Sequence, residues 1–277
     1  MGLISLLLLT ALPMPYSTCT KRVWTTAKEI GVDVTIVPVD LAKGAHKDPA
    51  YIENYHPFGI IPVLEVGPDE DGTKIYESRA IARYLVAKYG KGSPLLPAAS
   101  DAKAYGLFEQ AASIEYSSFD PSASGLAFER VFGPMRGLEP NKDLVKKYVD
   151  TLDAKLDGYE RILAKQKYLT FTLADLFHLP YGKMVYDLEP QLFSKREHLK
   201  NFTGGGKTFL LVLLGRRLRN SSSKQCRRSR LTIASRKRKR VNVECTNMGA
   251  VDRSLWRRTS PDLGVGLPCG YSRNHDC

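Results

Sequence analysis

The 277-residue sequence is 43% apolar and 25% charged, proportions typical of a soluble globular chain with one or two domains. Its formal net charge of +12 is unevenly distributed. Residues 204–277 contain 17 Lys and Arg against 4 Asp and Glu, a net charge of +13. Residues 1–203 hold the remaining 24 Lys and Arg and 25 Asp and Glu, a net charge of −1. The body of the chain is therefore close to neutral, and only the tail is basic.

The five cysteines exclude a disulfide framework for the body of the chain. Four of them lie in the basic tail, with no close pairing and no spacing typical of metal ligands. Only Cys19 precedes residue 204, which is typical of a protein in a reducing compartment. We therefore expect neither a structural disulfide nor a metal site.

The first twelve residues are almost entirely apolar and are predicted to form a buried strand that leads into a loop at Pro13. The segment is too short to span a bilayer. It has no positively charged start and no small-residue cleavage site before Pro13, so a secretory signal is the less favoured interpretation.

The next elements alternate between helix and strand. A helix is predicted after Ser17, where apolar residues recur at helical spacing until Gly31. The remaining expected elements are a strand over residues 33–38, a short helix over 49–55, strands over 63–66 and 74–76, and a helix that begins at Ser78. This order predicts an α/β domain over residues 1–90.

Beyond this domain the pattern becomes helical. Residues 91–100 are rich in Gly, Ser and Pro and are predicted to be a linker. Helices are expected over residues 102–119, 125–132, 143–164 and from 173 onward. Thr172 and Asp175 have the spacing of a capping box, which is strong evidence for a helix start. We expect an all-helical domain over residues 101–203 and a basic, disordered tail over residues 204–277.

The segment around Ile61 has the features of a site for an extended peptide. Only an X-Pro bond adopts the cis form at low cost, so the bond between Ile61 and Pro62 is a candidate cis peptide. Such a turn would leave the amide and carbonyl of Ile61 free to pair with the backbone of a small peptide. Ser78, at a helix start, would bind a carboxylate through its hydroxyl and the free amides of the first turn.

Ser17 has no His within sequence reach and no Gly-x-Ser-x-Gly context, so a hydrolytic role is poorly supported. A hydroxyl at a helix start is better suited to donating a hydrogen bond to an anion such as a thiolate. Lowering the pKa of a thiol by about two units costs about 2.7 kcal/mol. A hydrogen bond to a charged group contributes roughly 1.5 to 3 kcal/mol and a helix N-terminus about 0.3 to 1 kcal/mol, so the two together suffice.

Five segments resemble the cytosolic glutathione transferases, most closely the phi class and its fungal relatives. They are STCTKRV at 17–23, GAHK at 44–47, PFGIIP at 57–62, ESRAI at 77–81 and FTLAD at 171–175. Each segment alone is a weak motif, but five in this order at the family's spacing are highly specific. The resemblance extends roughly from Pro15 to Lys200.

The resemblance implies a thioredoxin-like N-terminal domain, an all-helical C-terminal domain and a cytoplasmic homodimer. The implied activity is conjugation of reduced glutathione to electrophilic small molecules. Glutathione is then a co-substrate, and no separate cofactor is implied. The family's final helices have no counterpart after about Phe202, so the helical domain over residues 101–203 is expected to be truncated.

Matched position by position, the resemblance also implies residue roles. Ser17 matches the residue that stabilises the glutathione thiolate. His46 and Lys47 match the residues that contact the glycyl carboxylate of glutathione.

The other end of the tripeptide is matched in the same way. Ile61, before the cis-proline Pro62, matches the residue whose backbone pairs with the cysteinyl part. Glu77 and Ser78 match the residues that hold the γ-glutamyl end. The hydrophobic electrophile is expected between the two domains, against side chains such as Phe119.

Three alternatives stay open at this stage. Ser17 taken alone would more often be an ordinary helix cap. The same fold also occurs in non-catalytic binding modules, including those of translation-elongation complexes. The tail, with a run of Lys and Arg at residues 236–240, would bind nucleic acid weakly and with strong salt dependence, or it is a translated non-coding stretch.

Overall fold

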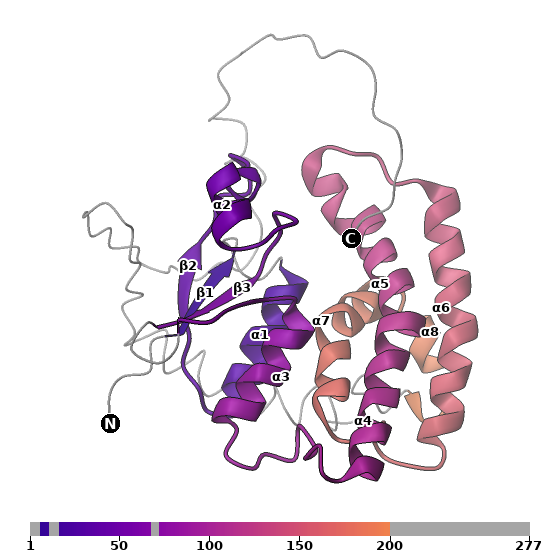
Figure 1. Cartoon of the computed structure of the whole chain (residues 1–277). Helices are drawn as coiled ribbons and strands as arrows, with labels where there is room; N and C mark the ends of the chain where they lie inside the picture. Colours follow the sequence, from indigo (N-terminus) through magenta and orange to yellow (C-terminus); the bar gives the residue numbers. More distant parts are fainter. Residues whose placement is uncertain (1–5, 11–16, 68–71, 200–277) are drawn as a thin grey trace, which may run out of the picture. The chain divides into compact units, whose positions relative to one another are not determined.

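The computed structural model describes residues 6–10, 17–67 and 72–199 (Figure 1). The predictions made for the loop at Pro13 and for the tail over residues 204–277 lie outside these ranges. None of the helices within the described ranges combines the length and the apolar character needed to cross a bilayer.

A four-stranded mixed sheet has the strand order β2-β1-β3-β4. Its strands are β1 (Leu6–Thr10), β2 (Thr35–Pro38), β3 (Val63–Val66) and β4 (Lys74–Tyr76). β1 runs parallel to β2 and antiparallel to β3, and β3 pairs antiparallel with β4, so both strands predicted over residues 63–66 and 74–76 are confirmed. The strand predicted in the apolar start of the chain is confirmed and lies in the middle of the sheet.

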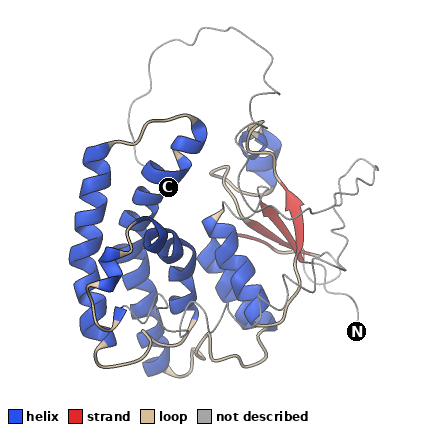
Figure 2. Ribbon diagram, turned by 180° about the vertical axis from the view of Figure 1, so that it is seen from behind, coloured by secondary structure: helices blue, strands red, loops and turns tan. Residues whose placement is uncertain are grey.

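Alternating side chains of β1 pack into two different hydrophobic clusters, one on each face of the sheet. Leu6 and Leu8 pack with Leu64 of β3 against the helices α1 (Thr18–Glu29) and α3 (Ser78–Tyr89). Leu9 points the other way and packs with Val63 and with Tyr51 of α2 (Pro49–Asn54). The period of two in a strand therefore explains why almost every position of this strand is apolar. Figures 1 and 2 show α1 and α3 side by side along the sheet.

The helical domain begins with one nearly continuous helical path. α4 (Ala102–Ile114) passes through a π-helical segment, Glu115–Phe119, into α5 (Asp120–Ala127), and a second π-helical segment follows at Phe128–Phe132. The break predicted between residues 119 and 125 is therefore wrong. Pro121 lies in the first turn of α5, directly after the π-helical segment, and the helical path continues past it.

Three further helices complete this part of the chain: α6 (Lys142–Leu163), α7 (Leu173–Leu188) and α8 (Gln191–Ser194). Their apolar faces meet those of α4 and α5 around Phe108, Leu152 and Phe177, each fully buried. The predicted helix start at residue 173 is confirmed, because α7 begins at Leu173 behind a complete capping box.

The capping box of α7 does more than close the helix end. The carboxylate of Asp175, which is 2% exposed, accepts the backbone N–H groups of Leu169, Thr170 and Thr172 at 3.0 to 3.3 Å. A single carboxylate therefore satisfies three donors of the turn that joins α6 to α7.

The variant Asp175→Ala is expected to lower the free energy of unfolding by about 3 kcal/mol or more, because each buried donor left without an acceptor costs about 1 to 3 kcal/mol. Asp143→Ala, in the exposed first turn of α6, removes one dipole interaction worth about 0.3 to 1 kcal/mol. Urea unfolding at one protein concentration measures both losses. Equal losses in the two variants would contradict the role assigned to Asp175.

Candidate functional site

Ser17 occupies the predicted position at the start of α1. It is the N-cap residue, with φ −93° and ψ 102°, and its Oγ accepts the N–H of Thr20 at 3.3 Å. The side chain is half-buried, and no acidic residue lies in the first turn of α1. The N-terminus of α1 therefore offers a hydroxyl and a positive helix end to an anion.

The sheet register brings Ser17 to the same edge as the predicted peptide-binding segment. The side chain of Thr10, the last residue of β1, hydrogen-bonds Thr20, and Thr20 in turn contacts Ser17. In the antiparallel pair of β1 and β3, Leu9 lies opposite Val63. Pro62, one residue before Val63, therefore lies next to the end of β1.

The Ile61–Pro62 peptide bond is cis, as the sequence predicted. The hydroxyl of Tyr51 donates to the carbonyl of Ile60 at 2.9 Å and fixes the preceding residue. Burial raises the pKa of Tyr51 to about 12, so this hydroxyl keeps its proton at neutral pH. Among the described residues, no backbone partner is found for the N–H or the carbonyl of Ile61. Both groups are therefore available to an extended peptide.

His46 and Lys47 lie beside the same segment. The ammonium group of Lys47 donates to the carbonyl of Phe58 at 3.1 Å. Gly59 has φ +61°, and a Cβ at this position would lie 2.6 Å from the carbonyl oxygen of His46, so only glycine permits this approach. The buried Nδ1 of His46 has no hydrogen-bond partner among the described residues. Burial, followed by the charges of Lys47 and Arg136, lowers the pKa of His46.

Glu77 and Ser78 lie at the start of α3, where the sequence placed them. Glu77 is the N-cap residue with φ +67° and ψ 110°, a conformation that residues other than glycine rarely adopt and that concentrates at ligand sites. Ser78 is buried, and its Oγ accepts a hydrogen bond from Nη1 of Arg22 at 2.8 Å. The structure thus joins the start of α3 to α1, the helix that Ser17 caps.

Sequence reasoning missed a buried ion cluster behind these residues. Arg79 binds Glu115 through two hydrogen bonds of 2.7 and 2.8 Å and also pairs with Asp120. Arg22, completely buried, lies 3.5 Å from Glu115 and 3.4 Å from Asp120. The available signal was the position of Arg22 on the helix face that also carries the buried residues Thr18 and Thr26.

The expectation that the electrophile lies against Phe119 is wrong. The side chain of Phe119 is 3% exposed and packs against the rings of Tyr159 and His178 in the core of the helical domain. Helical periodicity continues through this segment and turns Phe119 inward. The exposed aromatic side chains of the same region are Tyr116 and Phe128.

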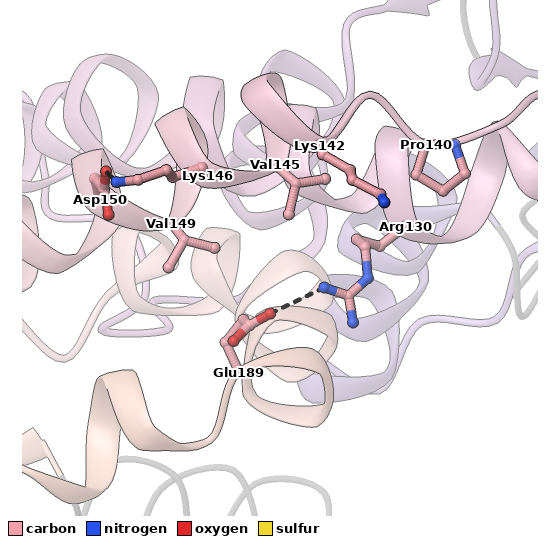
Figure 3. Close-up of a pocket in the computed structure, with 8 residues that line it drawn as sticks. All are labelled: Arg130, Pro140, Lys142, Val145, Lys146, Val149, Asp150 and Glu189. Carbon is pink, nitrogen blue, oxygen red and sulfur yellow. Dashed lines mark hydrogen bonds and ion pairs between the residues drawn. The ribbon is translucent and has the colours of Figure 1, made fainter.

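A cavity of about 420 Å³ lies elsewhere, along α6 (Figure 3). Val145 and Val149 line it together with Arg130, whose guanidinium pairs with Glu189 at 3.1 Å. None of the residues with a predicted role in binding glutathione lines this cavity.

Comparison with known proteins identifies the family. The model described as "Glutathione S-transferase, N-terminal domain" matches residues 16–88, and "Glutathione S-transferase, C-terminal domain" matches residues 117–204. "Glutathione S-transferase PM239X14" of Arabidopsis thaliana is 72% identical over 212 residues, which cover 76% of this chain and 94% of the relative. The chain belongs to the glutathione transferase family.

Two further relatives agree with this assignment. "Glutathione S-transferase hmp2" of Hypomyces subiculosus is 44% identical over 165 residues, covering 58% of this transferase and 76% of the relative. The crystal structure of glutathione transferase F7 from Populus trichocarpa is 33% identical, with a TM-score of 0.66 over 73% of this chain and 93% of that chain. The predicted thioredoxin-like sheet domain and the helical domain are confirmed. The predicted transferase activity is also confirmed, and neither the non-catalytic nor the nucleic-acid alternative is favoured.

The variant Glu115→Gln is expected to lower the free energy of unfolding of this transferase by about 3 to 5 kcal/mol, because the completely buried guanidinium of Arg22 and the partly buried guanidinium of Arg79 lose a shared negative charge. Glu109→Gln is the matched control. Glu109 pairs with Arg83 at 3.1 Å where both side chains are partly exposed, and such pairs contribute about 0 to 1 kcal/mol. Urea unfolding compares the two variants, and a loss at Glu115 no larger than that at Glu109 would refute the importance of the cluster.

Proposed function

We propose that this transferase binds reduced glutathione in an extended form, with its thiol at Ser17, and conjugates it to a hydrophobic electrophile. The observation that carries this proposal is the backbone of Ile61. Its N–H and carbonyl have no partner among the described residues. They lie between the turn that carries His46 and Lys47 and the start of α3 at Glu77 and Ser78. A tripeptide with a carboxylate at each end matches this arrangement, in which a free backbone segment lies between two groups that can bind anions.

The two ends of glutathione differ in what they require. The glycyl carboxylate is a simple anion. Lys47 offers it an ammonium group, and the imidazole of the neighbouring His46 is a second hydrogen-bond donor. The γ-glutamyl end carries an ammonium group as well as a carboxylate. The carboxylate of Glu77 can pair with the ammonium group, while the hydroxyl of Ser78 and the N-terminus of α3 can bind the carboxylate.

The chemical step follows from the position of Ser17. Its hydroxyl donates to the glutathione sulfur and stabilises the thiolate relative to the thiol, whose proton is released to solvent, and the N-terminus of α1 adds to this effect. The thiolate then attacks the electrophilic carbon, and the new sulfur–carbon bond forms as the leaving group or the π electrons depart from that carbon. Ser17 takes no covalent part in this step.

The finer assignment of this transferase is also a proposal. The five motifs support the assignment to a phi-class protein of fungal type. The identity to the fungal relative is 44%, against 72% to the relative from Arabidopsis thaliana, so the identities by themselves favour a plant-like protein over the fungal type. Membership of the family supports a homodimer in the cytoplasm that takes glutathione and hydrophobic electrophiles. The domain boundaries at residues 90 and 101, the absence of any cofactor other than glutathione as co-substrate, and the weak binding of nucleic acid by the tail stay predictions.

The variant Ser17→Ala is expected to lower kcat/KM for a chlorodinitrobenzene-type substrate by about 10- to 150-fold, which corresponds to a lost hydrogen bond to a charged group of roughly 1.5 to 3 kcal/mol. The dissociation constant of glutathione, measured by calorimetry, is expected to stay within about threefold of the wild-type value, because both ends of the peptide remain held. Ser124→Ala, in the helical domain, is the control. Unchanged turnover in the Ser17 variant would remove Ser17 from the mechanism.

The variant Lys47→Ala is expected to weaken glutathione binding by about 3- to 30-fold, because a charge-assisted contact to the glycyl carboxylate is lost. Glutathione esterified at its glycyl carboxylate is the matched ligand. It should bind the wild-type protein and the variant with similar affinity, since the anion that Lys47 contacts is absent from the ester. A variant that discriminates against the ester as strongly as the wild type does would place the glycyl end elsewhere.

A further inference from the structure

Three hydroxyl groups form a continuous chain that ends at Ser17. Thr10 closes β1 and Thr20 lies in the first turn of α1, and both side chains are completely buried. The Oγ1 of Thr10 hydrogen-bonds the Oγ1 of Thr20. The same oxygen of Thr20 lies 2.7 Å from Oγ of Ser17. These hydroxyl groups therefore connect the end of the central strand β1 to the half-buried helix cap.

The direction of these hydrogen bonds follows from counting donors. A hydroxyl donates one hydrogen and accepts two. If Thr10 donates to Thr20 and Thr20 donates to Ser17, the Ser17 oxygen accepts both the O–H and the N–H of Thr20. Its two lone pairs are then occupied, and its own hydrogen must point away from the helix.

The reverse direction leaves a buried group without a partner. The hydrogen of Ser17 would then be directed at Thr20, and that of Thr20 at Thr10. Oγ1 of Thr10 hydrogen-bonds Thr20, and none of the other described residues would accept its hydrogen in this arrangement. A buried donor without an acceptor is costly, so the first direction is favoured.

We propose that Thr10 and Thr20 are positioning residues that aim the hydroxyl hydrogen of Ser17 at the sulfur of glutathione. The proposal rests on the proposed role of Ser17 as the group that stabilises the thiolate. The ordered chain removes the need to turn the hydroxyl when the thiolate forms. Each hydroxyl in it also polarises the next, so Ser17 becomes a stronger donor than an isolated serine.

The same helix provides a control for a purely structural role of buried threonines. Thr26 is completely buried in α1, but its hydroxyl donates to the carbonyl of Arg22 at 2.9 Å, one turn earlier in the helix. That bond is local, and within the described part of the chain no hydrogen bond of the Thr26 hydroxyl leads to Ser17. Thr26→Val therefore reproduces the loss of a buried hydroxyl from α1 without interrupting the hydrogen bonds that connect Thr10, Thr20 and Ser17.

The experiment compares Thr20→Val, Thr20→Ser and Thr26→Val in the full-length chain. The first readout is the ultraviolet absorbance of the thiolate of bound glutathione as a function of pH, and the second is the pH profile of kcat/KM. In Thr20→Val we expect the bound thiol to titrate about half to one pH unit higher. Near pH 6.5, kcat/KM should fall about three- to tenfold, with the affinity for glutathione within about twofold of wild type. Thr20→Ser should restore both profiles, and Thr26→Val should leave them unchanged.

Two results would overturn the proposal. One is a bound thiol that titrates at the same pH in Thr20→Val as in the wild type. The other is an equal shift in Thr26→Val. If Thr20→Val does not fold, Thr10→Val opens the chain at its other link and is expected to raise the titration of the bound thiol by a smaller amount. A bound thiol that titrates at the wild-type pH in that variant would likewise refute the proposed role of Thr10 and Thr20.

The Ser17→Ala variant separates this proposal from the proposed function. Turnover could be lost in Ser17→Ala while the bound thiol titrates at the wild-type pH in Thr20→Val and Thr10→Val. That result would leave Ser17 in its role and refute only the contribution of the two threonines. Retained turnover in Ser17→Ala would remove both.

Discussion

A completely buried guanidinium holds the parts of this transferase together. Arg22 of α1 donates to the carbonyl of Phe177 in α7 and to the hydroxyl of Ser78 at the start of α3. It also lies within 3.5 Å of the carboxylates of Glu115 and Asp120. A buried cation is tolerated only where its hydrogen-bond donors and its charge find partners. The positions of four segments of the chain are therefore fixed relative to one side chain.

The proposed glutathione site follows from this constraint. Fixing α1 against α3 sets Ser17, which caps the first helix, relative to Ser78, which begins the second. The sheet register adds the third position, because the end of β1 lies beside Pro62. Groups that come from residues 17, 61 and 78 of the chain thus meet along one edge of the sheet. A tripeptide that needs contacts at its thiol, at its cysteinyl backbone and at its γ-glutamyl end fits such an edge.

Much of the fold and of the candidate site could be predicted from local signals. The helix start at Ser17, the strands β3 and β4 and the cis bond before Pro62 depend on residues close together in the sequence. Other features depend on contacts between distant segments. The orientation of Phe119 is one, because helical periodicity gives its face but not the part of the molecule that this face meets.

The sequence by itself determined the order of the elements, the residues that begin the two helices beside the site and the resemblance to a family. Turn, cap and periodicity signals act over a few residues, so they survive without knowledge of the fold. Only the tertiary structure decided that Arg22 binds Ser78 and that Thr10 and Thr20 connect the sheet to Ser17. Arg22 and Ser78 are 56 positions apart in the chain. No local pattern records such a pairing, because it depends on how the helices pack once the core is buried.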